Sequence, residues 1–320
     1  MRRRELIGSI VSVTFAWPLR AFGQQSSSKI WRVAFLHPET LSAVFDAFRM
    51  EMQTLGYIES RNLIIDTRYA EGQLDRLPSL MGELLALHPD VVVAVATPAV
   101  VAAQRATSTI PIVMGPASDP VGSGFIKSLA RPGGNITGMS NMFSDTTAKS
   151  VEVLHTLLPS ARLIAVLMSS NPIHPREYEL VAAAARQLGI AVIPVIAPTP
   201  ADLEQAFERM TQAHCDALFV LADPTRPAIV TLAAKSKMPT MYQFSNFVEL
   251  GGLVSYGPDV KRIFAKVAHY VDKIFKGANP ADLPVEQPIV FELALNLKAA
   301  ASLGLTIPDG LMARADKVIE

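Results

Sequence analysis

Residues 91–96, with the sequence VVVAVA, form an almost uninterrupted run of β-branched and other small apolar side chains. A run of this length is typical of a strand buried on both faces, as in a parallel sheet covered by helices on either side. An alanine-rich segment, 99–105, follows and is predicted to be helical, and the next apolar run, 110–114, is predicted to be a strand. A strand, a helix and a strand in this order predict a parallel βαβ unit.

The same alternation of short apolar runs and amphipathic segments extends along most of the chain. Strands are predicted at 31–36, 63–69, 91–96 and 110–114, and again at 163–168, 190–196, 217–221, 240–244 and 253–256. Helices are predicted at 44–55, 77–87 and 99–105, and again at 146–158, 177–188, 202–212 and 227–236. The fold class is therefore expected to be α/β, with two Rossmann-like lobes built on parallel sheets.

The last part of the chain is longer than a second lobe requires. An amphipathic helix ends at Gly277, a Pro-rich stretch covers 280–288, and a strand at 289–293 and a helix to Leu303 follow. We expect the chain to cross between the lobes several times, which would give a multi-strand hinge. The predicted first lobe comprises residues 29–138 and 257–285, and the predicted second lobe comprises 139–256 and 286–320.

The N-terminus has the pattern of an export signal. Three arginines at positions 2–4 precede a mostly apolar stretch, 6–17, and small residues occupy positions 21 and 23. Residues 1–23 are predicted to be a secretory signal peptide, by the general route or, because of Arg3-Arg4, by the twin-arginine route. Cys215, the single cysteine, lies far from the cleavage point, so neither an intramolecular disulfide nor a lipid anchor is expected. The expected mature protein is a periplasmic monomer.

Length and charge limit the function classes. Removing 23 residues from 320 leaves 297, which suits two domains better than one. The 29 basic and 29 acidic residues balance, and this gives no electrostatic reason to expect binding to nucleic acid or an anionic membrane. A small-molecule partner is the remaining expectation.

Residues 109–141 are expected to form half of a binding site. An apolar strand breaks into a loop that carries Ser118 and Asp119, a helical turn is predicted at 125–130, and a short strand is predicted at 135–137. Ligands of parallel α/β sheets bind at such strand ends. The end of the stretch is predicted to be the first crossing between lobes, so that Gly138→Pro should impair closure more than lobe folding.

The usual motifs of metal, phosphate and acyl-transfer sites are absent from the sequence. No two of the six histidines have metal-ligand spacing, and neither HExxH nor CxxC occurs. Gly122-Ser123-Gly124 lacks the third glycine of a dinucleotide fingerprint, and the segment 138–142 has Met142 where a nucleophile elbow requires glycine. No catalytic residue, metal or cofactor is therefore predicted, and we do not expect an enzyme.

Polar or aromatic residues follow the predicted strands in both halves of the chain. The predicted ligand-binding residues are His37, Thr97, Pro98, Ser118, Asp119, Ser170, Asn171, Asp223, Tyr242 and Tyr256. Hydroxyl groups such as those of Thr97 and Ser118, with nearby N–H groups, suit a carboxylate, and Asp223 suits an ammonium or a hydroxyl group. Tyr242 is expected to cover an apolar face of the ligand. For each residue the alternative is a role in a turn or a helix cap.

The segment SLARPGGNITG at residues 128–138 resembles a characteristic segment of the ABC-transporter substrate-binding proteins that include the tryptophan/tyrosine-binding type. The segments 118–121, 221–223 and 291–308 resemble the same family. The resemblance implies a type I periplasmic binding protein fold, and a function in which the lobes close on an amino acid or related small organic acid. It also implies an ABC permease in the inner membrane as partner.

Two other functions stay open at this point. A periplasmic sensor subunit would have the same fold and deliver its signal to a receptor, and an exported α/β hydrolase would need a nucleophile and a base that converge. A transcriptional repressor with this fold would begin with a helix-turn-helix, where this chain has a signal sequence.

Overall fold

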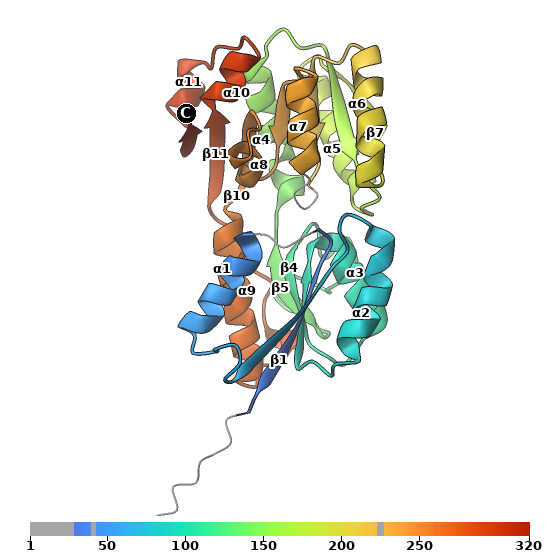
Figure 1. The fold of residues 1–320 in the computed structure, drawn as a ribbon, viewed down its shortest axis with the longest axis vertical. Coiled ribbons are helices and arrows are strands. Elements are labelled where there is room, and N and C mark those ends of the chain that lie inside the picture. Colours follow the sequence, from blue (N-terminus) through green and yellow to red (C-terminus); the bar gives the residue numbers. More distant parts are fainter. Residues whose placement is uncertain (1–28, 40–42, 223–226) are drawn as a thin grey trace, which may run out of the picture.

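The computed structural model describes residues 29–39, 43–222 and 227–320, and these residues form two α/β lobes, one above the other in Figure 1. We call the lower one, which contains β1, the first lobe and the upper one the second lobe. The predicted signal peptide, 1–23, and Asp223 lie outside the described residues. None of the described helices is long and apolar enough to span a bilayer.

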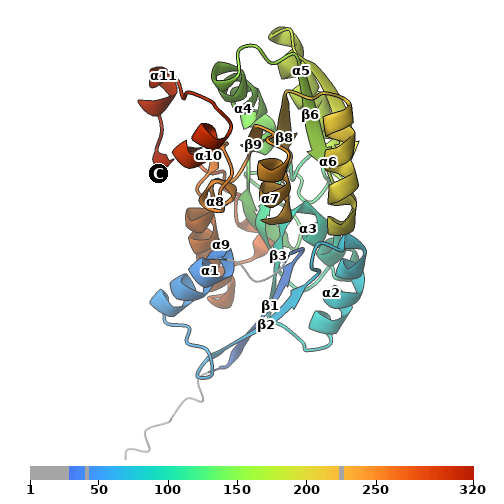
Figure 2. The same cartoon turned by 45° about the horizontal axis from the view of Figure 1, so that its top comes forward.

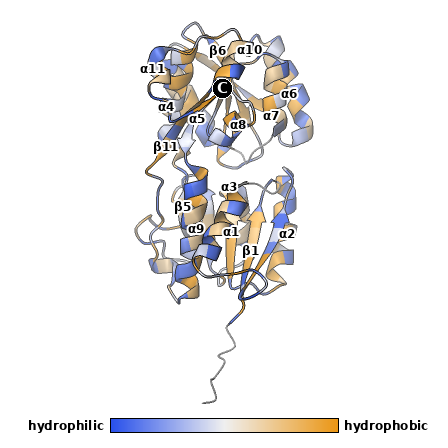
Figure 3. Cartoon of the chain, turned by 60° about the vertical axis from the view of Figure 1, so that its left-hand side comes forward, coloured by the Kyte–Doolittle hydropathy of each residue, from blue (hydrophilic) through white to orange (hydrophobic). Residues whose placement is uncertain are grey.

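The first lobe is built on a parallel sheet with the strand order β2-β1-β3-β4-β5. Its strands are β1 (Trp31–His37), β2 (Leu63–Tyr69), β3 (Val91–Val95), β4 (Ile112–Ala117) and β5 (Ile136–Ser140). Side chains alternate along each strand, so that Val33 and Phe35 pack against α1 (Ala43–Thr54) and α9 (Val260–Phe275). Ala34 and Leu36 face α2 (Leu77–Leu85) and α3 (Ala96–Ala106) on the other side. Both faces are covered, and Figure 3 shows the strands as predominantly hydrophobic.

The second lobe has the strand order β12-β11-β10-β9-β8-β6-β7, in which β10 and β11 are antiparallel and the other pairs are parallel. Its strands are β6 (Leu163–Met168), β7 (Ala191–Ile196), β8 (Ala217–Val220), β9 (Thr240–Tyr242), β10 (Val254–Pro258), β11 (Phe291–Asn296) and β12 (Lys317–Ile319). On one face lie α4 (Phe143–Leu157), α5 (His174–Gln187), α10 (Leu297–Ser302) and α11 (Asp309–Met312). On the other lie α6 (Leu203–Gln212), α7 (Pro227–Lys235) and α8 (Ser245–Glu249), as Figure 2 shows for α6 and α7.

Within the described residues, the chain crosses between the lobes at three places: after β5, between β10 and α9, and before β11. The first and third crossings are hydrogen-bonded to each other. Glu286 N donates to Gly138 O at 3.1 Å, and Ser140 N donates to Glu286 O at 3.0 Å. These paired crossings join the lobes on one side of the molecule.

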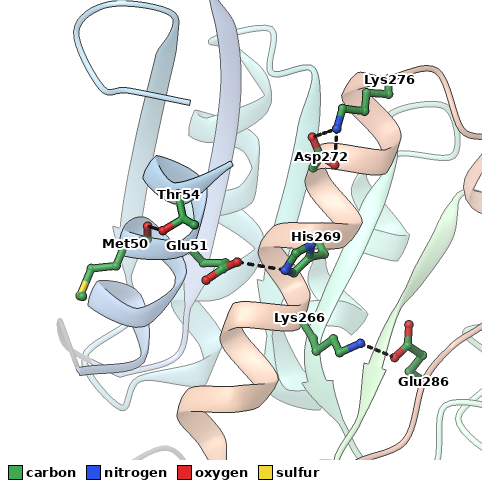
Figure 4. A network of polar contacts seen from close by, with 8 residues as sticks. All are labelled: Met50, Glu51, Thr54, Lys266, His269, Asp272, Lys276 and Glu286. Atoms are coloured by element: carbon green, nitrogen blue, oxygen red, sulfur yellow. Dashed lines mark hydrogen bonds and ion pairs between the residues drawn. The ribbon is translucent and has the colours of Figure 1, made fainter. Parts of the chain in front are cut away.

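Helix α9 belongs to the first lobe although it follows most of the second lobe in the sequence. It lies beside α1, and His269 Nε2 on α9 is 3.0 Å from Glu51 Oε1 on α1 (Figure 4). Lys266 Nζ on the same helix is 3.3 Å from Glu286 Oε2 at the third crossing (Figure 4). Helix α9 therefore connects the core of the first lobe to the hinge.

Some local predictions were wrong. No helix forms at residues 125–130, because the backbone there bonds to other parts of the loop: Phe125 N donates to Pro120 O, and Lys127 N donates to Pro132 O, both at 3.0 Å. The predicted strand 240–244 ends at Tyr242, and the short helix α8 follows. The sequence also did not predict α11 or the edge strand β12. The first crossing comes after Ser140, two residues later than the predicted boundary at 138.

Candidate functional site

A cavity of about 440 Å³ lies between the lobes, at the carboxyl ends of the central strands of both sheets. From the first lobe it is lined by residues at the ends of β1, β3 and β4 and at the start of α9. From the second lobe it is lined by the start of α4, the loops after β6 and β8, α8, and the strands β11 and β12. This volume is within the range of about 300–1,000 Å³ that is usual for small-molecule sites.

The floor of the cavity in the first lobe carries hydroxyl groups. Ser118 N donates to Thr97 Oγ1 at 3.1 Å, and both residues are buried. Strand β3 passes directly into α3 through Ala96, whose φ of 61° lies in the left-handed region. This conformation costs an alanine roughly 1–2 kcal/mol and brings the first turn of α3 to the cavity wall. A helix N-terminus with its unpaired N–H groups attracts negative charge.

His37 presents a neutral imidazole to the same cavity. Burial lowers the pKa of His37 to about 4, so the ring carries no charge at neutral pH. Its Nδ1 accepts the backbone N–H of Glu39 at 3.0 Å, which leaves the ring proton on Nε2. His37 is therefore a hydrogen-bond donor without a charge.

Aromatic side chains from both lobes form the apolar walls. Phe143, the first residue of α4, packs edge-to-face on Phe244, with ring centroids 4.9 Å apart. Phe264 of α9 lines the cavity from the first lobe. Such walls suit a flat, apolar ligand group.

Acidic groups outnumber basic ones among the described residues that line the cavity. The acidic residues are Glu39, Glu249, Asp259 and Glu292, and the basic residues are Lys261 and Lys317. Lys317 forms an ion pair with Glu249. Glu292 Oε2 accepts a hydrogen bond from Ser245 Oγ at 3.2 Å, and the Asp259 side chain caps α9 through Arg262 N at 3.2 Å. Asp259 also pairs with Arg262, with Nε 2.9 Å from Oδ2, so the excess of carboxylates is small. This excess favours a ligand that carries a cationic group.

Four of the predicted ligand-binding residues, His37, Thr97, Ser118 and Asn171, line the cavity. Asp223 lies outside the described residues. Pro98 is buried within α3 and Ser170 is exposed, and neither lines the cavity.

The two predicted tyrosines do not lie in the cavity wall. Tyr242 is completely buried in the core of the second lobe, where its ring stacks on Phe247 with centroids 4.7 Å apart. Tyr256 packs against Phe291, with centroids 6.2 Å apart. The side chain that reaches the cavity near the end of β9 is Phe244. The expectation that Tyr242 covers the ligand is therefore corrected.

Asp119 also has a different position from the predicted one. Its carboxylate forms an ion pair with Arg176 at the start of α5, so it links the first lobe to the second and does not line the cavity. Asp119 Oδ1 accepts the N–H of Gly122 at 3.1 Å. A Cβ atom at Gly122 would overlap both the carboxylate and the guanidinium, so glycine leaves room for this pair.

Several lining residues were not predicted from the sequence. They include Glu39, Asn141, Phe143, Phe244, Lys261, Glu292 and Lys317. Phe244 lies two residues from Tyr242, which the strand-end pattern did indicate, and Asn141 is the last residue of the stretch 109–141 that was expected to form half of a binding site. Glu292 and Lys317 come from strands whose place in the sheet is set by tertiary pairing. Over the part of the chain that the structure describes, no three His, Cys, Asp or Glu side chains group as a metal site.

Comparison with known proteins places the cavity in context. Residues 29–319 match the family described as ABC transporter substrate binding protein. A tyrosine-binding protein of Clostridioides difficile (strain R20291) is 26% identical over 265 residues, covering 81% of this chain and 76% of that protein.

Two solved structures are similar over almost their full length. The ABC domain in complex with L-Trp from Streptococcus pneumonia is 29% identical with a TM-score of 0.81, covering 90% of this chain and 99% of that one. A conserved domain protein from Vibrio cholerae O1 biovar eltor is 30% identical with a TM-score of 0.83, covering 91% of this chain and 100% of that one.

Proposed function

Because the chain belongs to the ABC transporter substrate-binding protein family, we propose that it captures an aromatic amino acid in the cavity between its lobes. The observation that carries the ligand class is the joint presence of aromatic walls, buried hydroxyl groups and an excess of carboxylates around one cavity. The tyrosine-binding relative and the L-Trp-bound structure support the same class.

Each part of an aromatic amino acid has a matching part of the cavity. Thr97, Ser118 and the N-terminus of α3 would take the carboxylate. The acidic side of the cavity would take the ammonium group, and Asp223 is a further candidate from the sequence pattern. The rings of Phe143 and Phe244 would pack on the side chain of the ligand.

Transport follows from closure of the lobes on the ligand. We propose that the first lobe, predicted as 29–138 with 257–285 and extended to Ser140 where β5 ends, moves as one unit against the second lobe, about the hydrogen-bonded crossings. The closed monomer would then present its ligand to an ABC permease in the inner membrane. Residues 1–23 would direct export to the periplasm, by either route named above, and no catalysis is proposed for a family of substrate-binding proteins.

Calorimetric titration of the mature protein tests the ligand class. L-Tryptophan, L-tyrosine and L-phenylalanine should bind, whereas tryptamine and indole-3-propionate should bind at least about tenfold more weakly, because each lacks one of the two charged groups. L-Leucine tests the need for an aromatic ring. Mass spectrometry of ligand released from freshly purified protein identifies an occupant directly. If none of the amino acids binds, the ligand class is wrong while family membership stands.

A further inference from the structure

Asn141 lies at the first crossing between the lobes. Its backbone N–H donates to Ala117 O at the end of β4, at 3.2 Å, and Phe143 begins helix α4 of the second lobe two residues later. Between them, Met142 has a φ of 59°, in the left-handed region that a methionine rarely adopts. The backbone direction therefore changes sharply between Asn141 and Phe143.

The side chain of Asn141 bridges this change of direction. Its Nδ2 donates to Ser118 Oγ at 2.9 Å, and its Oδ1 accepts the backbone N–H of Phe143 at 3.1 Å. Because a backbone N–H can only donate, the atom that faces Phe143 must be the oxygen, and this fixes the orientation of the amide. Asn141 is 6% exposed, so little water competes for these bonds.

This orientation determines what the hydroxyl of Ser118 can do. Its oxygen accepts from Asn141, and its backbone N–H is bonded to Thr97 Oγ1. A hydroxyl group has a single proton to donate. The Asn141 Oδ1 atom, 3.2 Å away, accepts that proton on its second lone pair, beside the bond from Phe143 N–H, when no ligand is present. The other direction open to the proton is the cavity, which Ser118 lines.

We infer that Asn141 is a positioning residue that turns the Ser118 hydroxyl proton toward an anionic group of the ligand and couples that contact to helix α4. A ligand carboxylate that takes the proton leaves Asn141 Oδ1 to Phe143 alone. The bond across the first crossing is then strengthened when the first lobe engages its ligand. This inference rests on the proposed function, since it requires an anionic group in the cavity.

The substitution Asn141→Asp separates positioning from structure. Aspartate has almost the same shape and still accepts the Phe143 N–H, but it cannot donate to Ser118 and accepts the hydroxyl proton itself. The Ser118 hydroxyl then no longer donates to the ligand, and the carboxylate introduced at position 141 faces the ligand carboxylate. The probes are L-tryptophan and L-tryptophanamide, which differ in the carboxylate. We expect the acid-to-amide affinity ratio, measured by calorimetry, to fall about tenfold.

Asn171→Asp is the matched control. Asn171 also lines the cavity, and its Oδ1 also accepts a backbone N–H two residues on, from Ile173 at 3.3 Å. The control adds the same charge to the same cavity from the opposite lobe, away from Ser118. The acid-to-amide ratio should therefore fall less in Asn171→Asp than in Asn141→Asp.

The outcomes separate this inference from the function on which it rests. If the wild type binds neither these probes nor other amino acids, the proposed ligand class fails and the inference fails with it. If the wild type binds and Asn141→Asp keeps the wild-type ratio, or loses no more than the control, only the inference is overturned. Ser118→Ala removes the hydroxyl group and replaces Asn141→Asp as the test if that variant does not fold. It should lower the acid-to-amide affinity ratio by a similar factor. An unchanged ratio overturns the inference.

Discussion

The Asp119 carboxylate of the first lobe and the Arg176 guanidinium of the second lobe form an ion pair across the gap between the lobes. The Arg176 side chain is 57% exposed and that of Asp119 is 21% exposed, so water and salt weaken their attraction. An exposed pair of this kind contributes roughly 0.2–1 kcal/mol. If the lobes open and close as proposed, opening would separate this pair, and its contribution would favour the closed form.

We predict that Arg176→Gln lowers ligand affinity by about two- to fivefold, because it removes an interaction between the lobes that the proposed opening would break. Raising NaCl to about 0.5 M should weaken binding by the wild type and change binding by the variant less. Calorimetry measures the affinity, and small-angle scattering measures the lobe separation without ligand. Arg186→Gln, on the same helix but in its last turn, is the control. Equal salt dependence in all three proteins would contradict a role for this pair.

Gly122→Ala should separate the same two groups without removing either charge. The added methyl group would overlap both Asp119 Oδ2 and Arg176 Nη1, so the guanidinium must move away. We expect a loss of affinity close to that of Arg176→Gln, with a melting temperature near that of the wild type. Gly134→Ala, where the methyl group meets open space, is the control. A wild-type affinity in Gly122→Ala would show that the pair does not assist closure.

Gly138 has a different role from the one its place at the crossing predicted. Its φ is 125°, and a Cβ atom there would lie 2.5 Å from Met114 O and 2.6 Å from Met114 N in the neighbouring strand. Even Gly138→Ala should therefore destabilise the first lobe, by at least about 3 kcal/mol in urea unfolding. A variant with wild-type stability but impaired closure in small-angle scattering would restore the original expectation for this glycine.

His37 should make stability depend on pH. Its folded-state pKa of about 4 is below the unfolded value of 6.5, so the unfolded chain binds the extra proton between these values. Stability from this group is therefore complete above about pH 6.5 and is lost as pH falls toward 4, by on the order of 3 kcal/mol. Urea unfolding of the wild type and of His37→Asn, between pH 7.5 and 4.5, measures the difference.

Asn can still accept the Glu39 N–H but does not titrate, so His37→Asn should lack this part of the pH dependence. The same substitution at the exposed residue His88 controls for the loss of a histidine elsewhere. Parallel stability profiles for the wild type and His37→Asn would rule out a buried neutral imidazole at His37.

The positions of Tyr242 and Phe244 predict that only the substitution at Phe244 weakens ligand binding strongly. Tyr242→Phe keeps the ring stacked on Phe247 away from the cavity and should change ligand affinity less than about twofold. Phe244→Ala removes a ring from the cavity wall and should weaken binding of L-tryptophan by about tenfold or more. Calorimetric titration of both variants decides this, and a large loss with Tyr242→Phe would return that residue to the binding site.

Apolar patterns predicted best the strands and helices that pack against elements near them in the sequence. Strands β2 and β6 have the predicted bounds. The apolar run of β6 is buried by the helices that flank it, whereas β2 is an edge strand in which only Leu63 is buried, and its alternating pattern predicted its bounds. The loop 125–130 has the composition of a helix, but the hydrogen bonds to Pro120 and Pro132 that replace the helical ones depend on a fold of the whole loop. Composition alone cannot show such bonds.

The same distinction, between local sequence patterns and tertiary pairing, explains which of the residues that line the cavity could be predicted. His37, Thr97, Ser118 and Asn171 were found because parallel strands end at one edge of a sheet, which follows from strand order along the chain. Glu292 and Lys317 line the cavity because β10 and β11 pair antiparallel and β12 adds to their edge, and no local pattern indicates that pairing. Asp119 satisfied the strand-end rule, yet a partner from the other lobe holds it outside the cavity.

The late position of α9 has a consequence for biosynthesis. The Tyr57 hydroxyl donates to Asp272 Oδ1 at 3.0 Å across a separation of 215 residues, and one face of the first sheet is covered only by α1 until α9 has been made. Contacts this distant in sequence slow folding. Helix α1 covers part of that face from the start, but the first lobe remains incompletely packed until most of the second lobe has been synthesised. For the same reason, cutting the gene between the lobes would not yield two independently folding halves.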